Sequence, residues 1–173
     1  MLNKFVPDRV VNHYSELTAQ QLLNDKIKLF LCDIDNTLIE PDEPYISEEA
    51  LKYLESIMAV GIEVVLISNN TKERVSTFNE NMNLQTYPMA LKPLPKVYKQ
   101  IKKDFSHIDK SKMLSLGDQV MTDVLGSNLA GIKVVLTQRF VEKDLFVTKI
   151  NRMLENLMIK LLKSRKKWPD EEV

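Results

Sequence analysis

Carboxylate, hydroxyl and ammonium side chains occur at four places where an apolar run of the sequence ends. These candidate site residues are, in chain order, Asp33, Asp35, Thr37, Ser68, Asn69, Lys92, Asp118 and Asp123. Several carboxylates that lie close together repel one another, and a divalent cation removes that conflict. Mg²⁺ prefers oxygen ligands and keeps several waters, so a few carboxylates and a phosphate group suit it. The residue types therefore predict a magnesium site that acts on phosphate esters.

The spacing of Asp33 and Asp35 fits a two-step phosphoryl transfer. Just past the end of a strand, the backbone can direct one carboxylate at phosphorus and the other at the leaving group. The first can attack phosphorus, as in aspartyl-phosphate enzymes, and the second can protonate the leaving oxygen and later activate water. The transferring group is negatively charged, so an ammonium group and hydroxyl or amide donors are expected around it.

Alternating strands and helices are predicted to bring these segments together. Short apolar runs indicate buried parallel strands, while amphipathic stretches with N-cap residues, a first-turn proline and terminal glycines indicate helices. The predicted strands are 27–32, 63–67, 87–91, 112–116 and 133–136, and the predicted helices are 47–60, 71–82, 95–104, 121–130 and about 142–168. This alternation is typical of an α/β fold, a three-layer doubly wound parallel sheet. Functional groups in such sheets gather at the carboxyl ends of the strands, where all four polar segments fall.

Length and composition fit one domain over residues 1–173, with a core at about 27–140, an N-terminal lead at 1–26 and a basic C-terminal helix. Basic and acidic residues number 24 each, so net charge gives no reason to expect a nucleic-acid partner. No targeting segment or membrane-spanning run is evident, which predicts a cytoplasmic protein. The single cysteine, Cys32, lies in an apolar run and is expected to be a buried hydrophobe.

The polar segments resemble the motifs of the haloacid dehalogenase (HAD) superfamily of phosphatases. The first is DIDNT at 33–37, in the DxDxT form, followed in the family's order by Ser68, by Lys92 before a proline, and by GDQVMTD at 117–123. The segments DIDNTL, LISNN, ALKP and GDQVMTDV further resemble the YqeG-type branch of subclass IIIA, which is related to mitochondrial phosphatidylglycerophosphate phosphatases. The resemblance implies a Rossmann-like core without a large cap domain, and Mg²⁺ as the cofactor.

The resemblance also implies roles for the carboxylates. Asp33 would be the nucleophile and a metal ligand, and Asp35 the general acid and base, with its backbone carbonyl on the metal. Thr37 would brace the loop that carries them. Asp118 would bind the metal directly, and Asp123 would hold the metal site indirectly or through water.

The remaining motif residues would bind the phosphate. By the same resemblance, Ser68 would donate a hydrogen bond to the phosphoryl group, together with the backbone amide of Asn69. Lys92 would neutralise the charge of the phosphate and of the nucleophile.

Two segments bear on the substrate. Residues 38–46 can form a small flap but not a cap domain, so the site is expected to be open to large or membrane-bound substrates. In the C-terminal helix one stripe is basic (Lys149, Arg152, Lys160, Lys163) and another apolar (Phe146, Ile150, Met153, Leu157, Leu161). Such a helix can lie on an anionic membrane. A helix packed on the sheet with a solvated basic face shows the same pattern and is the simpler interpretation.

Three functions fit these observations. The first is a magnesium-dependent phosphatidylglycerophosphate phosphatase that works through an aspartyl-phosphate, with peripheral contact at the inner face of a membrane. The second is a phosphatase of the same superfamily for a nucleotide, sugar or protein phosphate. The third is a non-catalytic phosphate-binding or scaffold protein, which the presence of Asp33, Asp35, Lys92 and Asp118 argues against.

Overall fold

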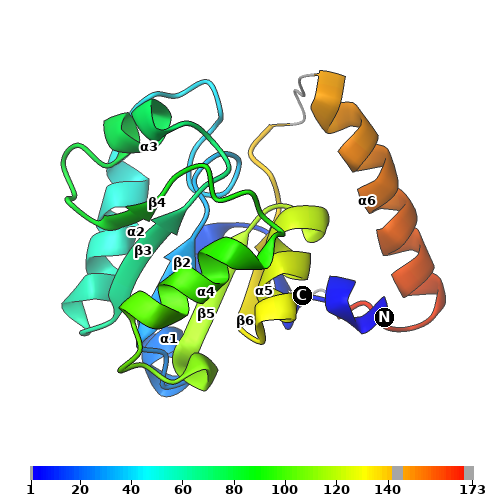
Figure 1. Ribbon diagram of the computed structural model, residues 1–173, viewed down its shortest axis with the longest axis horizontal. Coiled ribbons are helices and arrows are strands. Elements are labelled where there is room, and N and C mark those ends of the chain that lie inside the picture. Colours follow the sequence, from blue (N-terminus) through cyan, green and yellow to red (C-terminus); the bar gives the residue numbers. More distant parts are fainter. Residues whose placement is uncertain (1, 142–145, 170–173) are drawn as a thin grey trace.

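The structure is a computed structural model that describes residues 2–141 and 146–169, with the backbone alone described for 146–153. Its centre is a six-stranded, all-parallel sheet in the order β1-β6-β5-β2-β3-β4 (Figure 1). The strands are β1 Arg9–Val11, β2 Leu29–Cys32, β3 Glu63–Ile67, β4 Gln85–Tyr87, β5 Met113–Gly117 and β6 Lys133–Thr137. This is the doubly wound α/β fold that the sequence predicts.

Helices follow the strands and cover both faces of the sheet. They are α1 Ala19–Asn24, α2 Glu48–Ala59, α3 Lys72–Phe78, α4 Pro95–Asp104, α5 Leu125–Ala130 and α6 Phe146–Ser164. The local signals match: the Ser47 hydroxyl accepts a hydrogen bond from the Ala50 amide at the start of α2, and Pro95 opens α4. Gly131 ends α5 in a left-handed conformation, with φ of 70°.

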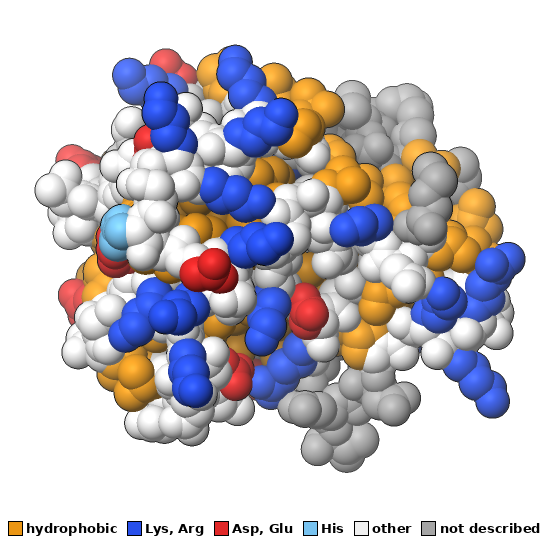
Figure 2. All heavy atoms as spheres, turned by 60° about the horizontal axis from the view of Figure 1, so that its bottom comes forward, with side chains coloured by type: hydrophobic (Ala, Val, Ile, Leu, Met, Phe, Trp, Pro, Cys, Tyr) orange, Lys and Arg blue, Asp and Glu red, His pale blue; other side chains and the backbone are white. Residues whose placement is uncertain are grey.

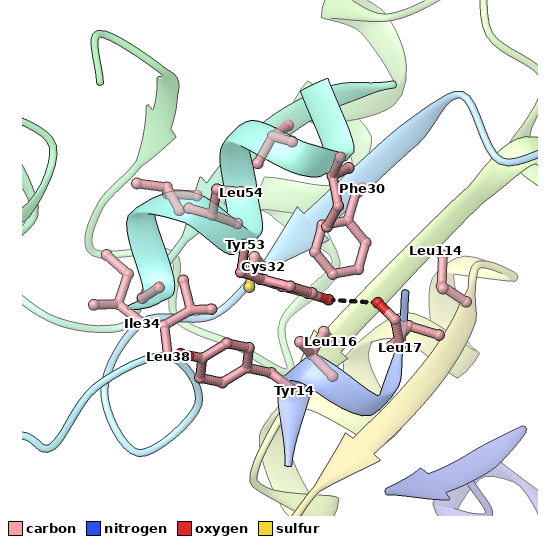
Figure 3. Packing of buried hydrophobic residues seen from close by; sticks show 14 of the residues in the cluster. Tyr14, Leu17, Phe30, Cys32, Ile34, Leu38, Tyr53, Leu54, Leu114 and Leu116 are labelled. Atoms are coloured by element: carbon pink, nitrogen blue, oxygen red, sulfur yellow. Dashed lines mark hydrogen bonds between the residues drawn. The ribbon is translucent and has the colours of Figure 1, made fainter. Parts of the chain in front are cut away.

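The core has two main parts, one on each side of β2. Phe30 and Cys32 face α2, while Leu29 and Leu31 face α4, as the alternation of a strand requires. Cys32 is buried as a small hydrophobe, which confirms its predicted role. Figure 3 shows how α2 is fixed to the N-terminal lead: the Tyr53 hydroxyl donates a hydrogen bond of 3.1 Å to the Leu17 carbonyl.

The structure corrects two predicted elements and adds two that were not predicted. The predicted strand 87–91 is wrong in position, because β4 is Gln85–Tyr87 and the backbone is left-handed at both Met89 and Leu91. The predicted helix 121–130 is divided into a π-helical turn, Val120–Val124, and the short α5. The N-terminal lead contributes an edge strand and a helix, β1 and α1, that the sequence did not reveal.

Helix α6 lies beside the β6 end of the molecule (Figure 1). Ile159, together with Trp168 after the helix, packs against an apolar cluster that includes Val120 and Leu136, and both Glu155 and Leu162 are buried. Leu157, predicted to belong to the packed apolar stripe, is 65% exposed. The predicted helix start at 142 and the side chains of Phe146, Lys149, Ile150, Arg152 and Met153 lie outside the described residues. Within the described part, no helix combines the length and apolar character needed to cross a bilayer.

Candidate active site

The central strands end at the same level, which brings their polar segments together. Cys32 at the end of β2 pairs with Leu66 of β3 and with Leu116 of β5. The next residue, Asp33, donates its backbone N–H to the Leu116 carbonyl at 3.0 Å. As predicted from their positions after the strands, Asp33, Ser68 and Asp118 therefore occupy one edge of the sheet, and all three are buried.

Lys92 is the cation at the centre of this edge. Its ammonium group lies 2.6 Å from Asp33 Oδ1 and 2.6 Å from Asp123 Oδ1, and it donates a third hydrogen bond to the Ile67 carbonyl at 3.0 Å. Although desolvation by itself lowers the pKa of a buried lysine, the two carboxylates outweigh it, so the pKa of Lys92 is raised. The structure thus brings together Asp33, Lys92 and Asp123 around one fixed positive charge.

Three carboxylates on this edge are arranged as a metal site requires. Within the described residues, atoms of Asp33, Asp118 and Asp123 that could bind a metal lie within 4.8 Å of one another. Desolvation, reinforced by the neighbouring carboxylates, raises the pKa of both Asp33 and Asp118. The buried Asp118 carboxylate accepts no well-aligned hydrogen bond from the described residues, and its Oδ2 faces Arg139 Nε at 2.9 Å as an ion pair. Buried oxygens of this kind, with an excess of negative charge, fit a divalent cation.

Two further contacts shape the carboxylate cluster. The Thr37 hydroxyl donates to Asp33 Oδ2 at 3.2 Å, which fixes the orientation of that carboxylate. Asp123 fills the space above Gly117: a Cβ atom at Gly117 would lie only 2.3 Å from Asp123 Cγ. The absence of a side chain at Gly117 therefore lets the Asp123 carboxylate reach Lys92.

The segment after β3 provides polar groups beside the cluster. The buried Ser68 hydroxyl accepts a hydrogen bond of 3.0 Å from the Asn70 amide. The Asn69 side chain binds the backbone of Lys92 on both sides, accepting from its N–H at 2.6 Å and donating to its carbonyl at 3.1 Å. The sequence suggested only a backbone role for Asn69, whereas its side chain positions the lysine loop.

Asp35 lies outside the buried cluster and is held by Arg74 of α3 and by Asn70, which precedes that helix. Arg74 donates from both Nε and Nη2 to Asp35 Oδ1, at 3.1 and 2.7 Å, and from Nη1 to the Pro44 carbonyl at 2.7 Å. Asn70 donates to the other Asp35 oxygen at 3.2 Å. Arg74 was not predicted; its place in the first turn of a helix that follows the Ser68 segment was the available signal.

A second ion-pair arrangement that was not predicted from the sequence connects Glu155 of α6 to Asp118 through Arg139. Arg139 Nε lies 2.9 Å from Asp118 Oδ2 as an ion pair, and Arg139 Nη2 binds the carboxylate of Glu155 on α6. Glu155 also accepts a hydrogen bond from the Val120 amide. A groove of about 450 Å³ between α6 and β6 reaches these residues. Glu155 was visible in the sequence as the lone acid among seven basic residues between 149 and 168, and burial explains that exception.

Comparison with known proteins agrees with this geometry. Residues 2–142 match the family described as mitochondrial PGP phosphatase. The chain is 32% identical over 166 residues to "Probable phosphatase YqeG" of Bacillus subtilis (strain 168), covering 95% of this chain and 96% of that protein. Among solved structures, it resembles an uncharacterised protein of Listeria monocytogenes (TM-score 0.54, 16% identity, covering 78% of this chain and 99% of that one).

A second solved structure of similar fold is a putative 3-deoxy-D-manno-octulosonate 8-phosphate phosphatase from Vibrio cholerae, with a TM-score of 0.53 and 14% identity, covering 85% of this chain and 90% of that one. At this identity the likeness concerns the fold alone. The family match and the Bacillus subtilis relative identify the chain as a phosphatase that belongs to the mitochondrial PGP phosphatase family.

Proposed function

Because the chain belongs to the mitochondrial PGP phosphatase family, we propose that it is a Mg²⁺-dependent phosphatidylglycerophosphate phosphatase that works through an aspartyl-phosphate on Asp33. The observation that supports this proposal best is the Asp33 carboxylate, buried against Lys92 and grouped with Asp118 and Asp123. Asp33, Asp118 and the Asp35 backbone carbonyl would hold the Mg²⁺, with Asp123 supporting the site. The bound ion would offset the charge of the carboxylates and of the phosphate.

In the first step, one Asp33 oxygen attacks phosphorus and the bond between phosphorus and the ester oxygen breaks. Asp35, in its protonated form, gives its proton to the leaving alcohol. In the second step, Asp35 takes a proton from water while that water attacks phosphorus, which releases inorganic phosphate and regenerates the Asp33 carboxylate. Asp35 lies outside the buried cluster with its side chain 21% exposed, and its contacts with Arg74 and Asn70 would have to open when it takes up the proton.

The remaining residues would stabilise the transferring group. Lys92 carries a positive charge fixed by three hydrogen bonds, so little reorganisation is needed when the phosphoryl charge develops beside it. The Ser68 hydroxyl and the Asn69 backbone N–H would donate to the phosphoryl oxygens. Thr37 keeps Asp33 Oδ2 in place through their hydrogen bond, so the Asp33 carboxylate would keep the same orientation from one catalytic cycle to the next.

A phospholipid is the substrate that the family description favours. The described residues include no inserted cap domain: residues 38–46 form only a short connection before α2, so a phosphate attached to a large body can approach. A phosphatase for nucleotide, sugar or protein phosphates is the alternative, and the fold of the Vibrio cholerae structure is compatible with it. Hydrolysis of a membrane phospholipid would also place the protein, at least transiently, at the cytoplasmic face of a membrane.

Phosphate release from a substrate panel tests the proposal. The panel contains phosphatidylglycerophosphate in detergent micelles, small nucleotide phosphates and sugar phosphates, and a phosphopeptide, all at the same Mg²⁺ concentration. We expect the highest kcat/KM on the lipid, no turnover after chelation of the metal, and no turnover by Asp33→Asn. Efficient hydrolysis of a small phosphate with none of the lipid would disprove the lipid assignment.

A further inference from the structure

Three large apolar side chains project from the loop that joins β4 to α4. Met89 is 65% exposed, Leu91 is 59% exposed and Leu94 is 54% exposed. The residues between them behave in the opposite way, since Ala90 and Lys92 are both 6% exposed. The loop therefore buries its small and charged side chains and exposes its large apolar ones. In most proteins large apolar side chains are buried and charged ones are exposed.

The backbone maintains this arrangement at a conformational cost. Met89 and Leu91 have φ of 48° and 53°, in the left-handed region that residues with a Cβ rarely adopt. Hydrogen bonds to the catalytic segment hold the loop: the Met89 amide donates to the Asn70 carbonyl at 2.9 Å, and the Ala90 amide to the Ser68 carbonyl at 3.0 Å. Because of these bonds, the exposed side chains are fixed directly beside the proposed active site.

Basic side chains continue the same surface along α4. Lys96, Lys99 and Lys103 are exposed on one face of the helix, and they line a shallow hollow together with Leu94 and Pro95. The opposite face of α4 packs on the sheet through Val97, Tyr98 and Ile101. The exposed apolar loop and the lysine face of α4 are therefore contiguous, with Leu94 at their junction.

We infer that the loop 89–94 and the lysine face of α4 form a docking surface for an anionic lipid bilayer. Apolar side chains can enter the interfacial region while adjacent lysines bind anionic headgroups. Although the whole chain has no net charge, Figure 2 shows a face on which basic side chains predominate over acidic ones, with hydrophobic side chains exposed among them. A lipid surface accounts for both kinds of side chain, whereas a nucleic acid would account only for the lysines.

This inference rests on the proposed function and extends it, because docking by this loop would bring the site edge to the membrane that contains the substrate. Lys92 lies within the same loop as the exposed side chains, and the Ser68 carbonyl accepts a hydrogen bond from the Ala90 amide of that loop. A phosphate that projects from the bilayer could then reach Asp33 without leaving the membrane. A protein partner on the same surface is the competing occupant.

Vesicle sedimentation of the full chain tests the inference, with phosphatidylcholine vesicles prepared with and without phosphatidylglycerol. We expect the protein to bind only the anionic vesicles, and less at high salt. The Lys96→Gln/Lys99→Gln/Lys103→Gln variant should bind roughly 100-fold more weakly, because each lysine near an anionic surface contributes favourably. Met89→Asn/Leu91→Asn should also lose binding, and asparagine tolerates the left-handed backbone at both positions.

The matched control is Leu157→Asn, which removes an exposed leucine from α6, far along the chain from this loop. It should bind vesicles like the wild type. All variants should hydrolyse p-nitrophenyl phosphate at the wild-type rate, which shows that they are folded. Unchanged binding by both surface variants, loss of binding in Leu157→Asn, or no binding of the wild type to anionic vesicles would overturn the inference.

The two proposals fail in different ways. If the wild type binds anionic vesicles through this loop but hydrolyses only small phosphates, the lipid substrate is wrong and the docking surface stands. If micellar phosphatidylglycerophosphate is hydrolysed while vesicle binding does not depend on the loop or the lysines, the docking surface is wrong and the proposed function stands.

Discussion

Replacement of the proposed nucleophile by asparagine should stabilise the metal-free protein while it abolishes activity. Desolvation is the main reason why the pKa of Asp33 is raised from 3.8 to about 7, with Asp123 adding to the effect and Lys92 opposing it. A pKa difference of this size corresponds to about 4 kcal/mol, at about 1.4 kcal/mol per pKa unit. Asp33→Asn has nearly the same shape, can still accept a hydrogen bond from Lys92, and avoids this cost of ionisation.

The sign of the pH dependence follows from the same shift. Because the pKa of Asp33 is higher in the folded than in the unfolded state, the folded state holds the proton more tightly. Its contribution to stability is present below pH 4 and is lost as the pH rises to about 7. Asp33→Asn should therefore be more stable than the wild type by up to about 4 kcal/mol at pH 8, and the difference should vanish near pH 4.

Urea unfolding of chelator-treated protein between pH 4 and pH 8 measures this difference. Added Mg²⁺ should stabilise the wild type far more than the variant, because the ion binds the folded carboxylates. Asp42→Asn, which removes an exposed acid from the 38–46 connection, is the matched control and should leave stability unchanged. A pH-independent difference, or a variant less stable than the wild type at pH 8, would refute the reasoning.

Substitutions at three other contacts give further tests. Lys92→Met should abolish phosphate release and destabilise the metal-free protein by about 3–5 kcal/mol in thermal unfolding, because it leaves buried carboxylates unpaired. Glu155→Gln should weaken Mg²⁺ binding roughly 10- to 100-fold in calorimetry, since it leaves the Arg139 charge beside Asp118 unbalanced, and adding Arg139→Gln should restore the affinity. Tyr53→Phe should lower the free energy of unfolding by about 1 kcal/mol without changing kcat; a larger loss would show that its contact with Leu17 is not the main contribution.

The sequence predicts the parts of this protein that repeat a simple pattern. Strands β2, β3, β5 and β6 are predominantly apolar, and Asp33, Ser68 and Asp118 follow three of them directly, so the convergence of these three residues follows from the parallel sheet. The edge strand β1 has only three residues, and its parallel pairing with β6 joins segments more than a hundred residues apart. No local pattern reveals such a pairing.

The contacts made by long side chains also could not be predicted from the sequence. Arg74 reaches Asp35 across 39 positions, and Arg139 reaches both Asp118 and Glu155 from a loop after β6. Each guanidinium group is one of many basic groups in the chain, so composition does not distinguish them. The exposed side chains at Met89 and Leu91 were missed for another reason: an apolar segment was interpreted as a strand, although its backbone is left-handed at two positions.

The close approach of Gly117 and Asp123 constrains how this protein can change over evolutionary time. Alanine at position 117 would place its Cβ atom 2.3 Å from Asp123 Cγ, so the substitution requires a smaller residue at position 123 first. A smaller residue there would remove one of the two carboxylates that hold Lys92. Glycine at 117 and aspartate at 123 are therefore expected to be retained together, because a larger residue at 117 clashes with Asp123 and a smaller residue at 123 gives up the contact with Lys92. Their joint presence would be a sharper criterion for recognising functional relatives than either residue alone.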